Sequence, residues 1–157
     1  MPTLSVTTVI DRPAYQVWNA VRDFRDPSAW YPVPLADAEG GAGAAAEPGA
    51  GDQVVRKVRA PGGALLHERL VEHDDDTCQY TYEVLGLEQQ PCRLRLDGPC
   101  LATLRVESII GGTMARVVWS VRYEPVTSQG EVERQRMRQV ERELFRPALK
   151  ELRRKMS

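Results

Sequence analysis

The 157-residue sequence has no apolar run near the roughly 20 residues that a transmembrane helix requires. Its first ten residues, MPTLSVTTVI, lack the basic start of a secretory signal peptide. We therefore expect no integral membrane segment and a cytoplasmic location. The formal net charge is only −1, so no overall attraction to nucleic acid or to an anionic membrane is expected, and nucleic acid is not a predicted partner.

The sequence is also poor in the groups that hold metals and cofactors. The three cysteines, Cys78, Cys92 and Cys100, are odd in number and lack metal-ligand spacing, which favours reduced thiols. His73 and the three aspartates that follow it form an "HDDD" stretch without the spaced ligands of a calcium loop, and we interpret it as a solvated turn. Phosphate loops, dinucleotide fingerprints and serine-nucleophile elbows are missing. We expect neither a metal nor a cofactor.

What the sequence does contain is enough apolar material, 42%, for one domain over residues 1–157. Alternating β-branched residues predict a first strand over Thr3–Ile10, and "RPAYQVWNAVRDF" predicts a helix that starts near Pro13. "DPSAWYP" predicts a second short helix or turn. Residues 39–51 are rich in Gly and Ala without any pattern, so we expect a mobile loop there, near the entrance of any pocket.

Strand patterns dominate the middle of the chain, and one helix follows them. Four or five antiparallel strands are predicted between residues 52 and 125, with residues 92–110 forming either two strands or one bent strand. From about Gly130 to Met156 an apolar stripe indicates one long helix, which Pro147 kinks or restarts. The stripe consists of Met137, Val140, Leu144, Ala148, Leu152 and Met156. This order predicts an α+β fold in which a curved antiparallel sheet packs around the C-terminal helix and encloses a cavity.

Two charged residues fall on strand faces that are otherwise apolar. Alternation places Arg56 between Val54 and Val58, and it places Glu68 between Leu66 and Leu70. Both strands flank the "PGG" turn, so they are hairpin neighbours and the two charges point the same way. A low-dielectric interior tolerates such opposite charges as a pair. Arg56 and Glu68 are therefore either a functional pair in a pocket or a structural salt bridge.

The order of elements resembles the START-like, helix-grip superfamily. The residues that carry the resemblance are "RPAYQVWNAVRDFRDPSAWYP" after the first strand and "VVWSVRYEP" before the last helix. Within the superfamily the chain is most similar to the polyketide cyclase/dehydrase and lipid-transport family, and it also looks like the lachrymatory-factor synthases and abscisic-acid receptors of plants. The resemblance implies a seven-stranded sheet that grips the C-terminal helix around a ligand cavity. It also implies that Arg56 and Glu68 take the place of the inward Arg and Glu that carry proton chemistry in the plant synthases.

Four aromatic residues complete the candidate ligand site. Tyr80 and Tyr82 share one strand face and offer either hydroxyls for a polar ligand group or hydrogen bonds within a mixed core. Trp119 is interpreted as core or cavity wall, with core favoured. Trp30 is interpreted as helix packing or as a residue at the cavity mouth.

Three classes of function follow. The first is binding of a small hydrophobic molecule with a polar group, such as a lipid or polyketide. The second is a cofactor-free cyclase, dehydratase or isomerase that uses Arg56 and Glu68 as its proton-transfer pair. The third is an interaction protein with a vestigial cavity. The basic residues of the C-terminal helix are interpreted as a solvated face, with an RNA or lipid surface as the alternative, and a homodimer is left open.

Overall fold

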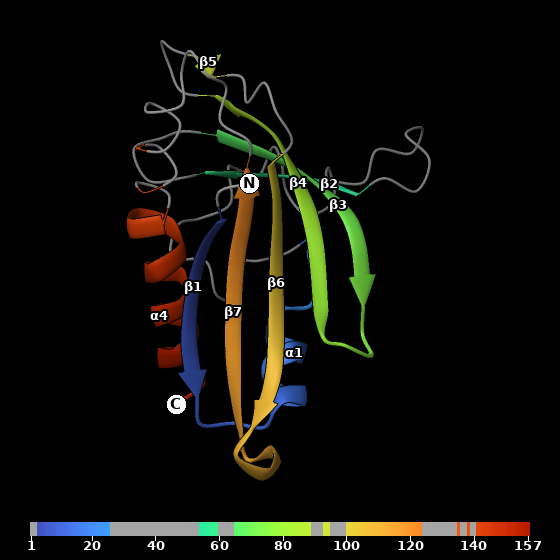
Figure 1. Ribbon diagram of the computed structural model, residues 1–157, viewed down its shortest axis with the longest axis vertical. Coiled ribbons are helices and arrows are strands. Elements are labelled where there is room, and N and C mark those ends of the chain that lie inside the picture. The colour runs from blue at the N-terminus through green and yellow to red at the C-terminus, as the bar shows by residue number, and fades with distance from the viewer. Residues whose placement is uncertain are drawn as a thin grey trace.

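The computed structural model describes residues 3–25, 54–59, 65–88, 93–94, 100–123, 135, 138 and 141–157. These residues form one curled antiparallel sheet with helices on its concave face (Figure 1). The N-terminal part consists of β1 (Thr3–Ile10), α1 (Ala14–Val21), β2 (Val55–Arg59), β3 (Leu65–Asp74) and β4 (Gln79–Glu88). The C-terminal part consists of β5 (Arg93–Leu94), β6 (Cys100–Ile109), the 3-10 turn η3 (Ile110–Gly112), β7 (Met114–Tyr123), the π-helical turn η4 (Glu141–Phe145) and α4 (Arg146–Lys155).

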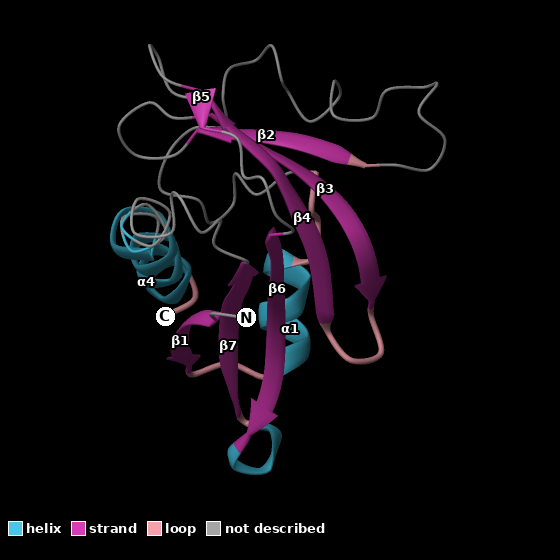
Figure 2. Cartoon of the chain, turned by 45° about the horizontal axis from the view of Figure 1, so that its top comes forward, coloured by secondary structure: helices cyan, strands magenta, loops and turns pink. Residues whose placement is uncertain are grey.

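The seven strands pair in the order β1-β7-β6-β4-β3-β2, and β5 adds to β4. Every pairing is antiparallel, which confirms the predicted fold class. Figure 2 shows that β2 and β3 bend away from the β1-β7-β6 side, so that the sheet curls. The question of one bent strand or two over residues 92–110 is settled as two strands, β5 and β6. The "DPSAWYP" element and the loop over residues 39–51 lie outside the described residues.

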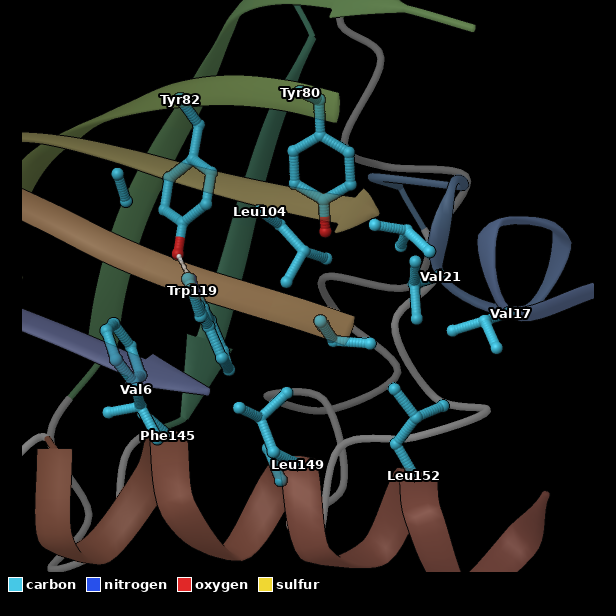
Figure 3. Packing of buried hydrophobic residues seen from close by; sticks show 14 of the residues in the cluster. Val6, Val17, Val21, Tyr80, Tyr82, Leu104, Trp119, Phe145, Leu149 and Leu152 are labelled. Atoms are coloured by element: carbon cyan, nitrogen blue, oxygen red, sulfur yellow. Dashed lines mark hydrogen bonds between the residues drawn. The ribbon is translucent and has the colours of Figure 1, made fainter. Parts of the chain in front are cut away.

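The core lies on the concave face because the strands alternate. On β6 every second residue is buried, from Cys100 to Val106, and on β7 the buried set runs from Ala115 to Val121. Helices α1 and α4 cover this face with the buried side chains Val17, Trp18, Val21, Ala148, Leu149 and Leu152 (Figure 3). The two helices on the concave side of the sheet thus enclose the interior.

The C-terminal helix packs as its apolar stripe predicts. Ala148 and Leu152 are buried, while the side chains of Val140 and Leu144 lie outside the described residues. Pro147 lies in the first turn of α4, directly after the π-helical turn, which confirms the expected interruption. The physical reason is that proline has no N–H to donate, so the helical hydrogen bonds must be rearranged before it.

The register of β3 against β4 shifts at two places, between His67 and Glu68 and between Leu70 and Glu72. The second shift leaves Val71 as the extra residue on β3. Past this bulge His73 pairs with Tyr80, and its ring stacks on the ring of Tyr80. The expectation that His73 belongs to the acidic turn was therefore wrong, because β3 continues to Asp74 and the bulge reverses which side chains face inward.

Candidate functional site

The two inward charges meet inside the sheet. Arg56 of β2 and Glu68 of β3 are directly opposite each other in the ladder, and Arg56 Nε donates to Glu68 Oε1 at 2.7 Å. Each residue is only 2% exposed. The pairing and the inward direction predicted from strand parity are thus confirmed. Their role in ligand binding or catalysis stays a prediction.

Several groups besides Glu68 support the Arg56 guanidinium. Nη1 donates to the backbone carbonyl of Phe24 at 3.0 Å. The guanidinium carbon lies 4.0 Å from the ring centroid of Phe24 and 4.9 Å from that of Tyr82, so two aromatic faces flank the cation. Phe24 follows α1 and reaches the site from the opposite side of the interior. One carboxylate, one carbonyl and two π faces therefore lie against the positive charge, and Tyr80 shares a hydrogen bond with it.

Burial raises the pKa of two acidic groups in this interior. Desolvation raises the pKa of Glu68 above its ordinary value of 4.5, and the ion pair with Arg56 opposes the rise. Desolvation also raises the pKa of Tyr80 above 10.0, and Arg56 again opposes the rise through its charge and a hydrogen bond. Tyr80 is thus a neutral phenol beside the ion pair. An acid with a raised pKa next to a fixed cation can exchange a proton with a bound molecule.

A second polar contact continues the site toward α4. Tyr82 and Trp119 are both 1% exposed, and Trp119 Nε1 donates to the Tyr82 hydroxyl at 2.9 Å (Figure 3). The Trp119 ring stacks on Phe145 at a centroid distance of 3.9 Å. Trp119 is therefore a core residue, as favoured from the sequence, and it links β7 to the start of the last helix.

Four of the five candidate residues on strands form one cluster, and the fifth contacts a member of that cluster. Tyr80, Tyr82, Arg56 and Glu68 form one cluster, with the Tyr80 and Tyr82 rings 6.1 Å apart. Trp119 joins it through Tyr82. Trp30 lies outside the described residues, as do the segments 26–53 and 95–99. The expected internal cavity and its entrance consequently stay predictions.

An exposed cluster at the β3–β4 turn clamps this turn to α1. Arg22 donates to both carboxylate oxygens of Asp75, at 3.1 and 2.9 Å, and Trp18 Nε1 donates to Asp75 Oδ1 at 2.8 Å. His73 Nε2 lies 3.0 Å from the same oxygen. These hydrogen bonds, with Arg22 first, hold the pKa of Asp75 well below its usual range. The sequence suggested only a solvated turn here, because a contact 53 residues away leaves no local signal.

Sequence reasoning missed Phe24 and Phe145 as members of this interior, and it missed the contact of the exposed His73 with Tyr80. Phe24 carried a signal, since it continues the apolar face of the first helix, but its carbonyl contact with Arg56 depends on the tertiary fold. Within the described ranges, no three His, Cys, Asp or Glu side chains converge as metal ligands would. None of the helices in those ranges is long and apolar enough to span a membrane.

Comparisons with known proteins identify the fold class independently. No functionally curated protein is detectably similar to the sequence. The solved structure of XoxI from Bacillus cereus is similar over 99% of this chain and 96% of its own, with 20% identity and a TM-score of 0.68. An aromatase/cyclase, ZhuI, from a Streptomyces species is similar over 99% of this chain and 93% of its own, with 15% identity and a TM-score of 0.66.

A third solved structure extends the same comparison. The START superfamily protein from Mycobacterium smegmatis matches over 98% of this chain and 96% of its own, with 12% identity and a TM-score of 0.55. At these identities the likeness shows a shared fold. The sequence itself matches one family model over residues 1–157. The chain belongs to the polyketide cyclase/dehydrase and lipid transport family.

Proposed function

We propose that the protein binds a small hydrophobic molecule that carries a polar group, with the apolar body in the curl of the sheet and the polar group at Arg56 and Glu68. The observation that carries the proposal is the burial of both charges, each 2% exposed, in an interior that is otherwise aromatic and aliphatic. Removing two charges from water is unfavourable, and a well-packed apolar pair often serves stability better. Stability alone therefore does not explain why the two charged residues are present. A ligand with a charged or hydrogen-bonding group would explain it, because the pair can bind that group.

The chemistry of the cluster defines the ligand's polar group. Arg56 supplies donors, Glu68 accepts or donates according to its protonation, and Tyr80 supplies a neutral hydroxyl. A carbonyl, enol, phenol or carboxyl group suits this set. The aromatic rings of Phe24 and Tyr82 favour a flat or unsaturated body beside it. Lipids and polyketides both contain such combinations, in keeping with the family to which the chain belongs.

A second candidate is catalysis on the same molecule without a cofactor. The observation that favours it is the raised pKa of Glu68 beside a fixed cation. Glu68 would take a proton from the ligand and return it elsewhere, and Arg56 would stabilise the negative charge that develops on the ligand oxygen. Cyclisation, dehydration and isomerisation all consist of such steps. The Streptomyces neighbour is named an aromatase/cyclase, which fits this class of reaction.

Native mass spectrometry of the purified protein tests the proposal. We expect a fraction of the protein to carry a co-purified molecule of a few hundred daltons, and organic extraction should remove it. The extracted molecule should raise the Tm of the stripped wild type and should do so less for Glu68→Gln, which keeps the side-chain shape. Conversion of the molecule by the wild type but not by Glu68→Gln would favour catalysis. A ligand that stabilises both proteins equally would refute the role of Glu68.

A further inference from the structure

Ile110 combines two unfavourable properties at the tip of the β6–β7 hairpin. It is 70% exposed, and its backbone φ is +50°, in the left-handed region that β-branched residues avoid. Asparagine or glycine would suit both the conformation and the solvent at this position. Ile110 has both an unfavourable backbone conformation and an apolar side chain in water. Residues that combine such unfavourable features are often functional, whereas an exposed leucine or valine on a regular strand is common and carries no such indication.

The turn around Ile110 is closed and holds its shape. Thr113 donates to the carbonyl of Ile110 twice, through Oγ1 at 2.8 Å and through its backbone N–H at 3.2 Å. Gly111 and Gly112 follow with φ values of +63° and +87°, which glycine adopts readily. The hairpin therefore presents the Ile110 side chain from a preorganised turn.

Other exposed apolar side chains lie at the same end of the molecule. Figure 1 shows that the end of β1, the start of α1, the tip of the β6–β7 hairpin and the C-terminus lie toward the same end of the molecule, with the hairpin tip projecting furthest. Val9 in β1 is 37% exposed and Tyr15 in α1 is 64% exposed. A pocket of about 190 Å³ lies between the end of β1, the start of β7 and the end of α4, and it is lined by Val9, Ile10, Asp11, Met114, Arg153, Met156 and Ser157. We call residues 9–15, 110–114 and 151–157 the hairpin end.

The hairpin end is cationic although the whole chain is not. Its charged residues are the cations Arg12, Arg153, Arg154 and Lys155 and the carboxylates Asp11 and Glu151. All four cations are exposed. The chain as a whole has a net charge of −1, so positive charge is concentrated at this end of the molecule. An exposed apolar tip at the same end as several exposed cations is complementary to an anionic lipid surface, whose headgroups attract the cations and whose acyl boundary accepts the apolar residue.

We propose that the hairpin end docks on an anionic lipid bilayer, with Ile110 inserted among the headgroups and the surrounding cations against lipid phosphates and carboxylates. A stable protein interface buries about 800 Å² on each partner over a packed surface, whereas this end offers a narrow protruding tip. One inserted side chain and a few cations give weak, reversible attachment, as for other peripheral contacts. The inference is independent of the ligand proposed above, because it uses none of the residues around Arg56.

Vesicle sedimentation with the full-length protein tests the proposal. The probes are vesicles of phosphatidylcholine alone and vesicles that also contain about 30% phosphatidylserine, an anionic lipid. We expect binding to the anionic vesicles, much weaker binding to the neutral ones, and loss of binding as NaCl rises from about 0.05 M to 0.5 M, where charges are screened. A protein that stays in the supernatant with anionic vesicles at low salt would overturn the proposal.

Ile110→Asn is the decisive variant because asparagine tolerates a positive φ, so the fold should be at least as stable. We expect its affinity for anionic vesicles to fall about tenfold, from the loss of the buried apolar side chain. Val71→Thr is the matched control: Val71 is 56% exposed, but it lies on β3 away from the hairpin end. Equal binding by wild type and Ile110→Asn, or equal losses in both variants, would contradict insertion of the tip.

A pair of charge variants tests the cations in the same assay. Arg153→Gln should weaken binding to anionic vesicles about fivefold and leave the weak binding to neutral vesicles unchanged. Arg138→Gln removes the same charge from a helical residue that lies earlier in the chain, outside the hairpin end, and should have no such effect. If the two variants behave alike, the attraction is not localised at the hairpin end.

If Ile110→Asn instead abolishes self-association seen by sedimentation velocity, the surface binds a second copy and the lipid proposal is wrong.

Discussion

Two ion pairs of similar length connect elements of this protein in different surroundings. Arg56 and Glu68 meet at 2.7 Å with side chains 2% and 3% exposed, and Arg22 and Asp75 meet at 2.9 Å with side chains 46% and 51% exposed. The distances suggest equal interactions. Their energetic weights differ, because water already solvates the exposed pair and salt screens it, whereas the buried charges depend on each other. The burial of an ion pair, more than the distance between its atoms, therefore determines how much stability the protein loses when the pair is removed.

The pairs also differ in the direction of their pKa shifts. Desolvation raises the pKa of the buried Glu68, and hydrogen bonds from Arg22 and its neighbours lower the pKa of the exposed Asp75. An arginine contact favours the ionised carboxylate in both places, but desolvation outweighs it at Glu68, so the two pKa values shift in opposite directions. Only the buried carboxylate is suited to exchange a proton.

The largest expected effect is the loss of one partner of the buried pair. Arg56→Met or Glu68→Leu alone should lower the free energy of unfolding by about 3–5 kcal/mol, because the surviving group is left buried without its main partner. The double variant should regain most of that loss, since two apolar side chains can pack in the same space. Urea unfolding of the four proteins measures this. Single variants with losses no larger than those of surface mutations would show that the pair is not buried in solution.

A smaller effect separates the charge of Glu68 from its hydrogen bond. Glu68→Gln keeps an acceptor for Arg56 and should change the free energy of unfolding by about 1 kcal/mol. Because folding raises the pKa of Glu68, the protonated acid is favoured in the folded state. The stability of the wild type relative to the variant should be highest below pH 4.5 and should fall as pH rises through the raised pKa. A relative stability that instead increases over this window would mean that the pKa is lowered.

Asp75→Asn should show the opposite pH dependence. The pKa of Asp75 is lowered in the folded protein, so its contribution is present above pH 3.8 and is lost as pH falls through the lowered pKa. At neutral pH we expect Tm to decrease by about 4 °C, since three side chains lose an ionised acceptor. Thermal unfolding from pH 7 to pH 2.5 tests this. A difference between wild type and variant that does not shrink between pH 4 and pH 2.5 would contradict the role of the ionised form.

The smallest effect is expected for Arg22→Gln. Asp75 keeps its hydrogen bond from Trp18 and its contact with His73, and water replaces the guanidinium. Tm should decrease by less than about 2 °C, and the decrease should vanish near 1 M NaCl, where the Debye length is about 3 Å. A decrease as large as that of Arg56→Met would abolish the contrast between the two pairs.

Strand alternation predicted the centre of the site because the hairpin between β2 and β3 is regular there. The "PGG" turn and a period of two place Arg56 opposite Glu68, and the structure has this register. The contacts of Arg56 with Phe24 were beyond reach, since they join positions 32 residues apart. The stacking of His73 on Tyr80 was missed because the bulge at Val71 places His73 opposite Tyr80, and apolar periodicity does not reveal a bulge.

Pro147 illustrates the same limit in a helix. The sequence located the interruption but gave no means of choosing between a kink and a restart, and the structure shows a π-helical turn followed by α4 with Pro147 in its first turn. Within the described residues, Ala148 and Leu152 of the expected stripe are buried, and Phe145 and Leu149 are buried beside them.

The proposed function requires that Arg56 and Glu68 are retained for a ligand. The most direct measurement is the mass of ligand held by the double variant Arg56→Met/Glu68→Leu, compared with the wild type in native mass spectra of identically prepared proteins. The account predicts a folded double variant, close to wild type in stability, whose bound mass is absent or strongly reduced. A folded double variant that retains the same molecule at the same occupancy would contradict the claim and leave the pair as a structural salt bridge.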